Sequence, residues 1–271
     1  MDRTWEDWVS LNSQSRFEPR SVKSVKHHLE LDDGSVVWNE KRLNKRALIK
    51  ADSSDIPTTE DREGYYGANH YNYWASGARD LAQILDYFDK KGGVAFDTTL
   101  DFGCASGRLT RHLHHSGKAR KVMGCDINRK HVDWASHYLP RDIITFQNTS
   151  VPHLPLSDAS VDLITSFSVF THIEAFEDTW FMELDRILRP EGIVWITIHG
   201  DRTWREVEEG WPLYEALKTH PDYAEHKDLD VPPFERTIYR WISDTSYSSN
   251  VFYTYEFVQK RFGQFYLYPF R

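Results

Sequence analysis

A glycine-containing turn between a predicted strand and a predicted helix is the feature of this chain best suited to chemistry. In residues 99–113 (TLDFGCASGRLTRHL), Asp101 ends an apolar run and Gly103 and Gly107 bracket the turn. Glycine has no Cβ, so the backbone can bend sharply and a ligand can approach it closely. The helix that follows begins with unpaired N–H groups and a positive dipole end. The segment therefore predicts a ligand site beyond the carboxyl ends of the strands of a parallel sheet.

A second acidic residue narrows the choice of ligand. Asp126 ends the next predicted strand, nineteen residues after Gly107, an offset at which a carboxylate can accept hydrogen bonds from ribose hydroxyls. A dinucleotide turn has the spacing G-x-G-x-x-G, whereas Gly103 and Gly107 are four positions apart. The carboxylate of Asp101 would repel a pyrophosphate but suits the amino group of a methionine moiety. These features favour S-adenosylmethionine over NAD.

Short apolar runs alternate with amphipathic segments around this turn. Strands are expected at 98–102, 121–125, 142–147, 161–167 and 193–198, and helices at 74–90, 109–115, 128–138, 175–188 and 253–262. This alternation predicts an α/β fold with a doubly wound, mostly parallel sheet and helices on both faces.

The chain is expected to have three parts. Residues 1–70 lack periodicity and are interpreted as an N-terminal extension with a hairpin-like piece at 28–38. Residues 71–200 would form the core that binds the cofactor. Residues 201–271 lose regularity until about Phe252 and are rich in aromatic residues, so we interpret them as a substrate lid followed by a C-terminal helix and strand that complete the same domain.

Four segments occur in the order typical of one enzyme class. LDFGCASGR, GCDIN, LPLSDASVDLI and RILRPEG all lie within residues 98–200. With them the chain resembles the class I (Rossmann-like) S-adenosylmethionine-dependent methyltransferases, and the last two segments resemble the small-molecule branch. The resemblance implies a methyl transfer from S-adenosylmethionine.

The resemblance also implies roles for ten cofactor-binding positions. They are, in chain order, Asp101, Gly103, Ala105, Gly107, Asp126, Ile127, Ser150, Val151, Ser166 and Phe167. The first four would surround the methionine part and the ribose. Asp126 would hold the ribose hydroxyls, the next three would lie near the adenine, and the last two would lie near the sulfonium.

Two departures from the family pattern stand out. Ala105 replaces the middle glycine of the turn, and its methyl group is tolerable if the φ angle there is negative. The family sheet usually ends in an antiparallel strand pair, whereas only one closing strand fits after the last predicted helix. The sheet edge is then either incomplete, lacking the last antiparallel strand, or covered by another element.

Histidines are the candidates for acid–base and metal chemistry. Methyl transfer depends mainly on positioning and on excluding water, and it needs a base only for a poorly acidic hydroxyl or a protonated amine. His172, just after the fourth strand, is the candidate catalytic base; a structural histidine bonded to backbone is the alternative, and His199 is a weaker candidate. The cluster from His112 to His115 lacks partners at metal-ligand spacing, so no metal site is expected.

The composition limits the partners. A net charge of −8 disfavours general attraction to nucleic acid or anionic lipid. Absence of a membrane-length apolar run or a signal-peptide pattern, together with only two cysteines, indicates a cytoplasmic protein without membrane insertion. We expect a small-molecule or glycan-precursor acceptor with oxygen as the methylated atom. The sequence does not indicate an oligomeric state.

Three other interpretations stay open. An NAD-dependent oxidoreductase could use the same sheet, and a non-catalytic S-adenosylmethionine-binding protein could retain the pocket. A nucleic-acid methyltransferase would need a basic face and an Asn-Pro-Pro-Tyr-type segment after the fourth strand, where SFSVF stands instead.

Overall fold

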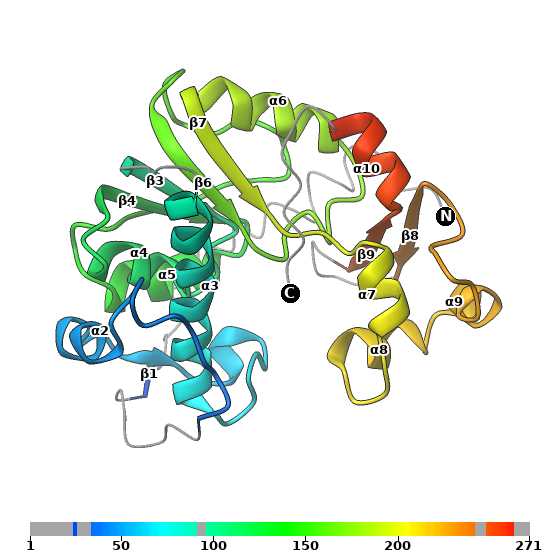
Figure 1. Cartoon of the computed structure of the whole chain (residues 1–271), viewed down its shortest axis with the longest axis horizontal. Helices are drawn as coiled ribbons and strands as arrows, with labels where there is room; N and C mark the ends of the chain where they lie inside the picture. The colour runs from blue at the N-terminus through cyan, green and yellow to red at the C-terminus, as the bar shows by residue number, and fades with distance from the viewer. Residues whose placement is uncertain (1–23, 26–33, 91–95, 242–247, 263–271) are drawn as a thin grey trace. The chain divides into compact units, whose positions relative to one another are not determined.

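The computed structural model describes residues 24–25, 34–90, 96–241 and 248–262 (Figure 1). The chain divides into two compact units. The first comprises Met1–Phe167 and Thr179–Trp195, and the second comprises Ser168–Asp178 and Ile196–Arg271.

A five-stranded sheet forms the centre of the first unit. Its strands are β3 (Phe96–Phe102), β4 (Ala119–Asp126), β5 (Ile144–Gln147), β6 (Val161–Ser166) and β7 (Leu188–Ile196), and their order is β5-β4-β3-β6-β7. The pairs β3–β4, β3–β6 and β4–β5 are parallel, and Asp101 lies opposite both Gly124 and Thr165. Parallel strands bring their carboxyl ends to one edge, so this register gathers Asp101, Asp126 and Ser166 at the same edge.

The helices around this sheet confirm the predicted doubly wound fold. They are α2 (Lys45–Ala51), α3 (His70–Lys90), α4 (Thr110–His115), α5 (Arg129–Tyr138) and α6 (Glu177–Ile187). Figure 1 shows α3, α4 and α5 on one side of the strands and α6 on the other. The apolar stripe expected on 74–90 is buried, and α3 begins a little earlier than predicted, at His70. The side chain of Asn128 caps α5 by accepting a hydrogen bond from the N–H of Lys130.

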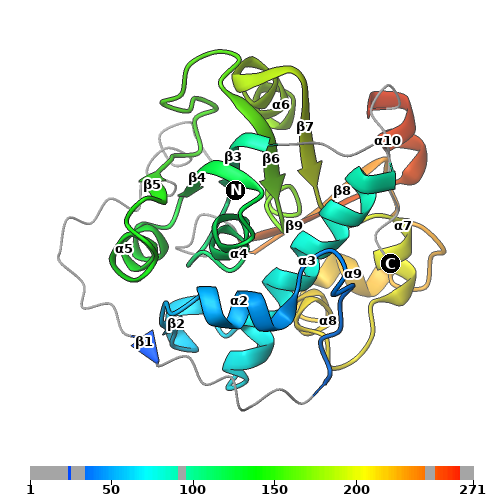
Figure 2. The same ribbon diagram turned by 60° about the vertical axis from the view of Figure 1, so that its left-hand side comes forward.

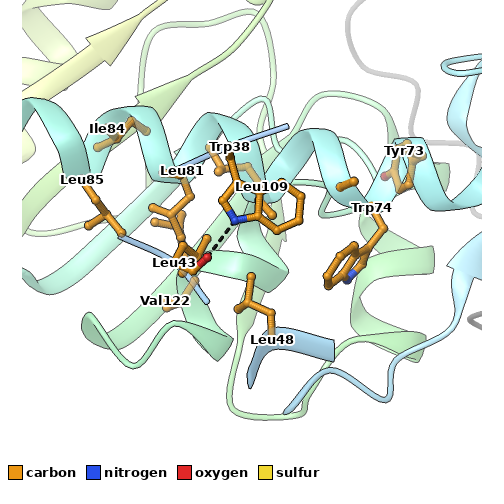
Figure 3. Packing of buried hydrophobic residues seen from close by; sticks show 14 of the residues in the cluster. Trp38, Leu43, Leu48, Tyr73, Trp74, Leu81, Ile84, Leu85, Leu109 and Val122 are labelled. Carbon is orange, nitrogen blue, oxygen red and sulfur yellow. Dashed lines mark hydrogen bonds between the residues drawn. The ribbon is translucent and has the colours of Figure 1, made fainter. Parts of the chain in front are cut away.

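The described part of the N-terminal segment belongs to the hydrophobic core of the first unit. Trp38, Leu43 and Leu48 are buried against α3 and α4, and the indole Nε1 of Trp38 donates to the carbonyl of Leu43 at 2.7 Å (Figure 3). The hairpin-like piece expected at 28–38 lies partly outside the described residues, and residues 34–38 form no strand. The antiparallel pair found in this segment is instead β1 (Ser24–Val25) with β2 (Ile56–Pro57).

A buried ion pair fastens this segment to the helices. Both side chains of Asp52 and Arg111 are inaccessible to solvent, and Nε and Nη2 of Arg111 bind the two carboxylate oxygens of Asp52 at 2.6 and 3.0 Å. Asp52 also accepts from the indole of Trp74 on α3 at 2.8 Å. Burial alone would raise the pKa of Asp52, but Arg111, with a hydrogen bond from His115, holds it well below its usual range. One carboxylate thus joins the end of α2 to α3 and α4, three helices that Figure 2 shows side by side.

The second unit is more regular than the sequence predicted. Its elements are α7 (Asp201–Glu206), α8 (Pro212–Leu217), α9 (Pro221–His226), β8 (Arg236–Arg240), β9 (Ser249–Tyr253) and α10 (Tyr255–Phe262). The expected loss of regularity up to Phe252 is therefore wrong. The helices of six residues are too short to show a helical period, and proline at the N-termini of α8 and α9 looks like a turn signal in the sequence.

An antiparallel pair is present, but it comes before the last helix. β8 and β9 pair with Arg236 opposite Tyr253 and Arg240 opposite Ser249, and α10 follows them. The closing strand that the sequence allowed after this helix falls at 263–271, outside the described residues. No helix in the described part of the chain is long and apolar enough to cross a bilayer.

Aromatic side chains and ion pairs hold the second unit together. Its core contains Trp204, Tyr223, Tyr239 and Phe252, and the rings of Trp204 and Tyr239 are stacked with centroids 6.3 Å apart. Segment 168–178 is tied to β8 by two ion pairs, Arg236–Glu177 at 2.6 Å and Arg240–Glu174 at 2.5 Å. Many aromatic residues of 201–255 therefore pack against one another within the unit.

Loss of the buried ion pair should destabilise the first unit. Replacing Arg111 by alanine strands a carboxylate in the core, so we expect the free energy of unfolding to fall by about 3–5 kcal/mol in urea titrations. The matched control is Arg120→Ala, which breaks the exposed bidentate pair with Asp97 and should cost less than about 1 kcal/mol. Equal losses in the two variants would contradict the role assigned to the buried pair.

Candidate functional site

The glycine turn folds back onto the end of β4. The N–H groups of Gly103 and Cys104 both donate to the carbonyl of Cys125, at 2.8 and 2.9 Å, and the N–H of Ala105 donates to the Asp126 carboxylate at 2.8 Å. Three turn residues have positive φ: Gly103 at 77°, Ala105 at 46° and Gly107 at 77°. The condition under which the methyl group of Ala105 would be free of backbone strain, a negative φ, is therefore not met. The hydrogen bond to Asp126 helps to hold this residue in the left-handed region, which costs about 1–2 kcal/mol outside glycine.

Asp126 is buried, and its carboxylate accepts hydrogen bonds from the glycine turn and from the residue that caps α5. Its Oδ2 accepts from Ala105 and its Oδ1 accepts from the N–H of Asn128 at 2.8 Å. Burial raises its pKa. Each carboxylate oxygen can accept a second hydrogen bond, so the group retains capacity for ribose hydroxyls.

Asp101 lies at the end of β3 between two threonine hydroxyls. Thr110 donates to Oδ2 at 2.6 Å and Thr165 donates to Oδ1 at 2.9 Å. Burial raises the pKa of Asp101, and the charge of Asp126 raises it further. The sequence analysis named neither threonine as a site residue. Thr110 could have been considered, because it lies in the first turn of the helix that follows the glycines.

Two buried acids at one sheet edge favour a ligand that carries positive charge. Their mutual repulsion and burial disfavour the ionised forms, and a sulfonium or ammonium group would offset that cost. Burial also raises the pKa values of the neighbouring Cys104 and Cys125 well above their usual range, so both are thiols. The chemistry of this group of side chains fits S-adenosylmethionine.

Two buried hydroxyls near the turn have no hydrogen-bond partner in the described structure. Among the described residues, the Tyr73 hydroxyl on α3 and the Ser166 hydroxyl at the end of β6 have no hydrogen-bond partner. Burial raises the pKa of Tyr73 to about 12. A buried hydroxyl without a partner costs free energy unless a ligand or a water molecule bonds to it.

Arg108, directly after Gly107, is a candidate that the sequence interpretation missed. Its Nη1 binds Asp80 at 2.5 Å and the hydroxyl of Ser76 at 3.1 Å. Its guanidinium lies 5.7 Å from the ring centre of Tyr65 and 5.9 Å from that of Phe167. A guanidinium beside the start of a helix can bind a carboxylate. The sequence did contain an indication of this role, because Arg108 is the positively charged residue directly after the second glycine of the motif.

The remaining predicted cofactor positions follow β4 and β5. Ile127 is half-buried, and its carbonyl accepts from the side chain of Gln147 at 3.0 Å. Ser150 is half-buried and Val151 is exposed, in the loop after β5. The N–H of Asn148 donates to the carbonyl of Asp126 at 3.1 Å, which keeps this loop beside the end of β4.

The candidate base, His172, belongs to the second unit. Its Nδ1 lies 2.6 Å from the carbonyl oxygen of Ser249, so Nδ1 carries a hydrogen and Nε2 is the proton-accepting atom of the neutral ring. Burial, together with the nearby His172, lowers the pKa of His199 to about 3. His199 is therefore neutral at pH 7 and a poor base.

The other histidines contact structural groups. His112 Nε2 lies 2.8 Å from the carbonyl of Trp74, and burial lowers the pKa of His112 to about 3. His115 Nε2 lies 3.3 Å from Asp52. In the described ranges, no group of three or more histidine, cysteine or acidic side chains is arranged to hold a metal ion.

Comparison with known proteins finds a methyltransferase domain within this chain. Residues 100–196 match a family model described as a methyltransferase domain. A demethylmenaquinone methyltransferase of Lactobacillus johnsonii is 30% identical over 59% of this chain and 64% of its own length. A malonyl-[acyl-carrier protein] O-methyltransferase of Hahella chejuensis is 26% identical over 62% of this chain and 63% of its own length. The chain thus spans less than two thirds of these curated relatives.

A solved structure is also similar to this chain. An S-adenosylmethionine-dependent methyltransferase of Aquifex aeolicus is 19% identical, with a TM-score of 0.38, over 61% of this chain and 86% of the other. The parallel sheet and the glycine turn define a class I S-adenosylmethionine-binding fold. The matched segment, residues 100–196, contains this turn and both acids, and it matches a methyltransferase domain.

Glycine at position 105 should relieve backbone strain. Ala105→Gly removes the left-handed penalty but increases the entropy of the unfolded chain, so we expect a net gain of up to about 1 kcal/mol in unfolding free energy. The matched control is Ala159→Gly, an exposed alanine with φ of 48°. Both variants should raise the midpoint of thermal unfolding, and a loss of stability confined to Ala105→Gly would contradict this account.

Proposed function

We propose that this chain transfers a methyl group from S-adenosylmethionine to a small-molecule or glycan-precursor acceptor. The observation that carries the proposal is the buried pair Asp101 and Asp126 around a left-handed glycine turn, within a segment that matches a methyltransferase domain. Negative charge at the sheet edge suits a cationic cofactor, which supplies a methyl group attached to a sulfonium.

We assign the parts of the site to the parts of the cofactor. Asp126 would accept the ribose hydroxyls, and Asp101, Gly103, Ala105 and Gly107 would surround the methionine portion and the ribose. We propose that Arg108 binds the carboxylate of the methionine. The side chains proposed to lie near the adenine are Ile127, Ser150 and Val151, and those proposed to lie near the sulfonium are Ser166 and Phe167.

Oxygen is the acceptor atom we propose. The relatives named as O-methyltransferases include the malonyl-[acyl-carrier protein] enzyme of Hahella chejuensis and an erythromycin 3''-O-methyltransferase of Saccharopolyspora erythraea, which is 26% identical over 58% of this chain. The net charge of −8 also favours a small acceptor over a nucleic acid. Two buried free cysteines accord with a cytoplasmic setting.

His172 is the base we propose for a hydroxyl acceptor. The bond between Nδ1 and the Ser249 carbonyl fixes the ring and directs the proton-accepting function to Nε2. The aromatic residues of 201–255 are proposed to border the acceptor, although several of them pack within the second unit. Removal of a base typically lowers the rate by a factor of 10² to 10⁴.

Cofactor binding should depend on Asp126. We expect calorimetric titration with S-adenosylhomocysteine to give micromolar affinity, about −8 kcal/mol, and Asp126→Asn to weaken it at least about tenfold, or 1.4 kcal/mol. Asp133→Asn, which removes a partly exposed partner of Arg129, is the control and should bind like the parent. Heat with NADH but none with S-adenosylhomocysteine would favour an oxidoreductase instead.

Methyl transfer should depend on His172 without a matching loss of cofactor binding. With tritiated S-adenosylmethionine and a hydroxylated acceptor identified by screening, we expect His172→Gln to lower kcat about 100-fold or more. His137→Gln, an exposed histidine on α5, should leave kcat unchanged. Unaltered turnover in His172→Gln would reduce His172 to a structural role, and binding without turnover for every acceptor would favour a non-catalytic binding protein.

A further inference from the structure

A buried histidine lies directly behind the glycine turn. His131, on α5, is 4% exposed. Its Nδ1 lies 2.9 Å from the hydroxyl of Ser106 in the turn, and its Nε2 lies 3.4 Å from a carboxylate oxygen of Glu63 in the N-terminal segment. The imidazole therefore joins two segments that are far apart in the sequence and that meet at the proposed cofactor site.

Hydrogen-bond directions assign the protons on this ring. The Ser106 hydroxyl has one hydrogen and donates it to the carbonyl oxygen of Asp61 at 2.9 Å. Its contact with His131 must then use an oxygen lone pair, so Nδ1 is the donor. On the opposite side, Nε2 faces a carboxylate, which only accepts when ionised, so Nε2 also carries a hydrogen. A ring that donates from both nitrogens is an imidazolium.

Acidic groups from two elements favour this charged ring. Burial lowers the pKa of His131, but the hydrogen bond to Glu63 and the charges of Glu63 and Asp126 outweigh burial and raise it above its usual value. Glu63 comes from the N-terminal segment and Asp126 from the end of β4. In turn, the positive ring favours the ionised form of Asp126.

The positive charge next to His131 on the same helix is paired with acids of another element. Lys130, on the same helix, lowers the pKa of His131, but its Nζ is held 2.9 Å from Asp61 and 3.8 Å from Glu60, both in the 3-10 helix η2 (Glu60–Arg62). The turn contributes Ser106 and the thiol of Cys104, whose raised pKa keeps it uncharged. The titration that matters at this position near neutral pH is therefore that of the imidazole.

We propose that His131, as an imidazolium, is a positioning residue of the cofactor site that holds Ser106 in the turn and offsets the charges of Asp126 and Glu63. Cofactor affinity then falls when the ring loses its proton. The neutral ring would turn a nitrogen lone pair toward Glu63, and Glu63 also accepts from the side chain of Asn128 at 3.0 Å. Because the Asn128 N–H binds Asp126, the disturbance reaches the residue proposed to bind ribose. This inference rests on the proposed function.

The test is the pH dependence of cofactor affinity between pH 5.5 and 8.5. Calorimetry with S-adenosylhomocysteine should show the parent losing about tenfold in affinity as the ring deprotonates, the change that corresponds to one unit of pKa shift on binding. Glu63→Gln should move the midpoint to lower pH, because it removes a charge that favours the imidazolium. His131→Gln should be weak throughout and lose this transition, and the exposed His137→Gln is the matched control.

A second measurement keeps the inference separate from the proposed function. Nuclear magnetic resonance titration of the ligand-free protein should give His131 a pKa above the usual value of about 6.5, and Glu63→Gln should lower it. A raised folded-state pKa also adds stability below the unfolded value that is lost as pH rises through the folded one. A His131 that titrates below about 6.5, or identical affinity profiles for the parent and a folded His131→Gln, would overturn the inference. If S-adenosylhomocysteine does not bind but His131 still titrates above about 6.5, the result counts against the methyltransferase proposal alone.

Discussion

The ion pair between Asp52 and Arg111 fixes where the N-terminal segment lies against α3 and α4. Both groups are fully removed from solvent, and neither is tolerable there without the other. Arg111 stands in α4, the helix that leaves the glycine turn, and Asp52 also accepts from Trp74 of α3. The pair therefore couples the packing of the N-terminal segment to the position of the turn, although Asp52 and Arg111 are 59 positions apart in the chain.

The proposed cofactor site contains several energetically costly features. Ala105 has a left-handed backbone, Asp101 and Asp126 are buried acids with raised pKa values, and the hydroxyls of Tyr73 and Ser166 lack partners in the described structure. Strain and buried charge of this kind are typical of functional sites. A cationic ligand with hydroxyl and carboxylate groups would offset the buried negative charge and give the two hydroxyls hydrogen-bond partners, which is the physical basis for proposing S-adenosylmethionine there.

Prediction from sequence was accurate where local pattern and tertiary structure agree. The five strands and the helices between them follow from apolar runs and helical periods, because each buries a regular face. Prediction from sequence was inaccurate in 200–252, because helices of six residues are too short to show a helical period. It also gave no indication that Glu63 and His131 meet, because that contact depends on how the N-terminal segment packs against α5.

The sequence by itself determined the class of fold and pointed to the acids that are proposed to bind the cofactor, because the glycine turn and Asp126 are separated by a short, regular strand–helix unit whose geometry follows from hydrophobic patterning. Only the tertiary structure decided which groups complete the site. The left-handed φ of Ala105 arises with a bond from its N–H to a carboxylate 21 positions away. The charge on His131 depends on a serine and a glutamate brought together by packing. Such contacts join segments distant in the chain, and no local pattern encodes them.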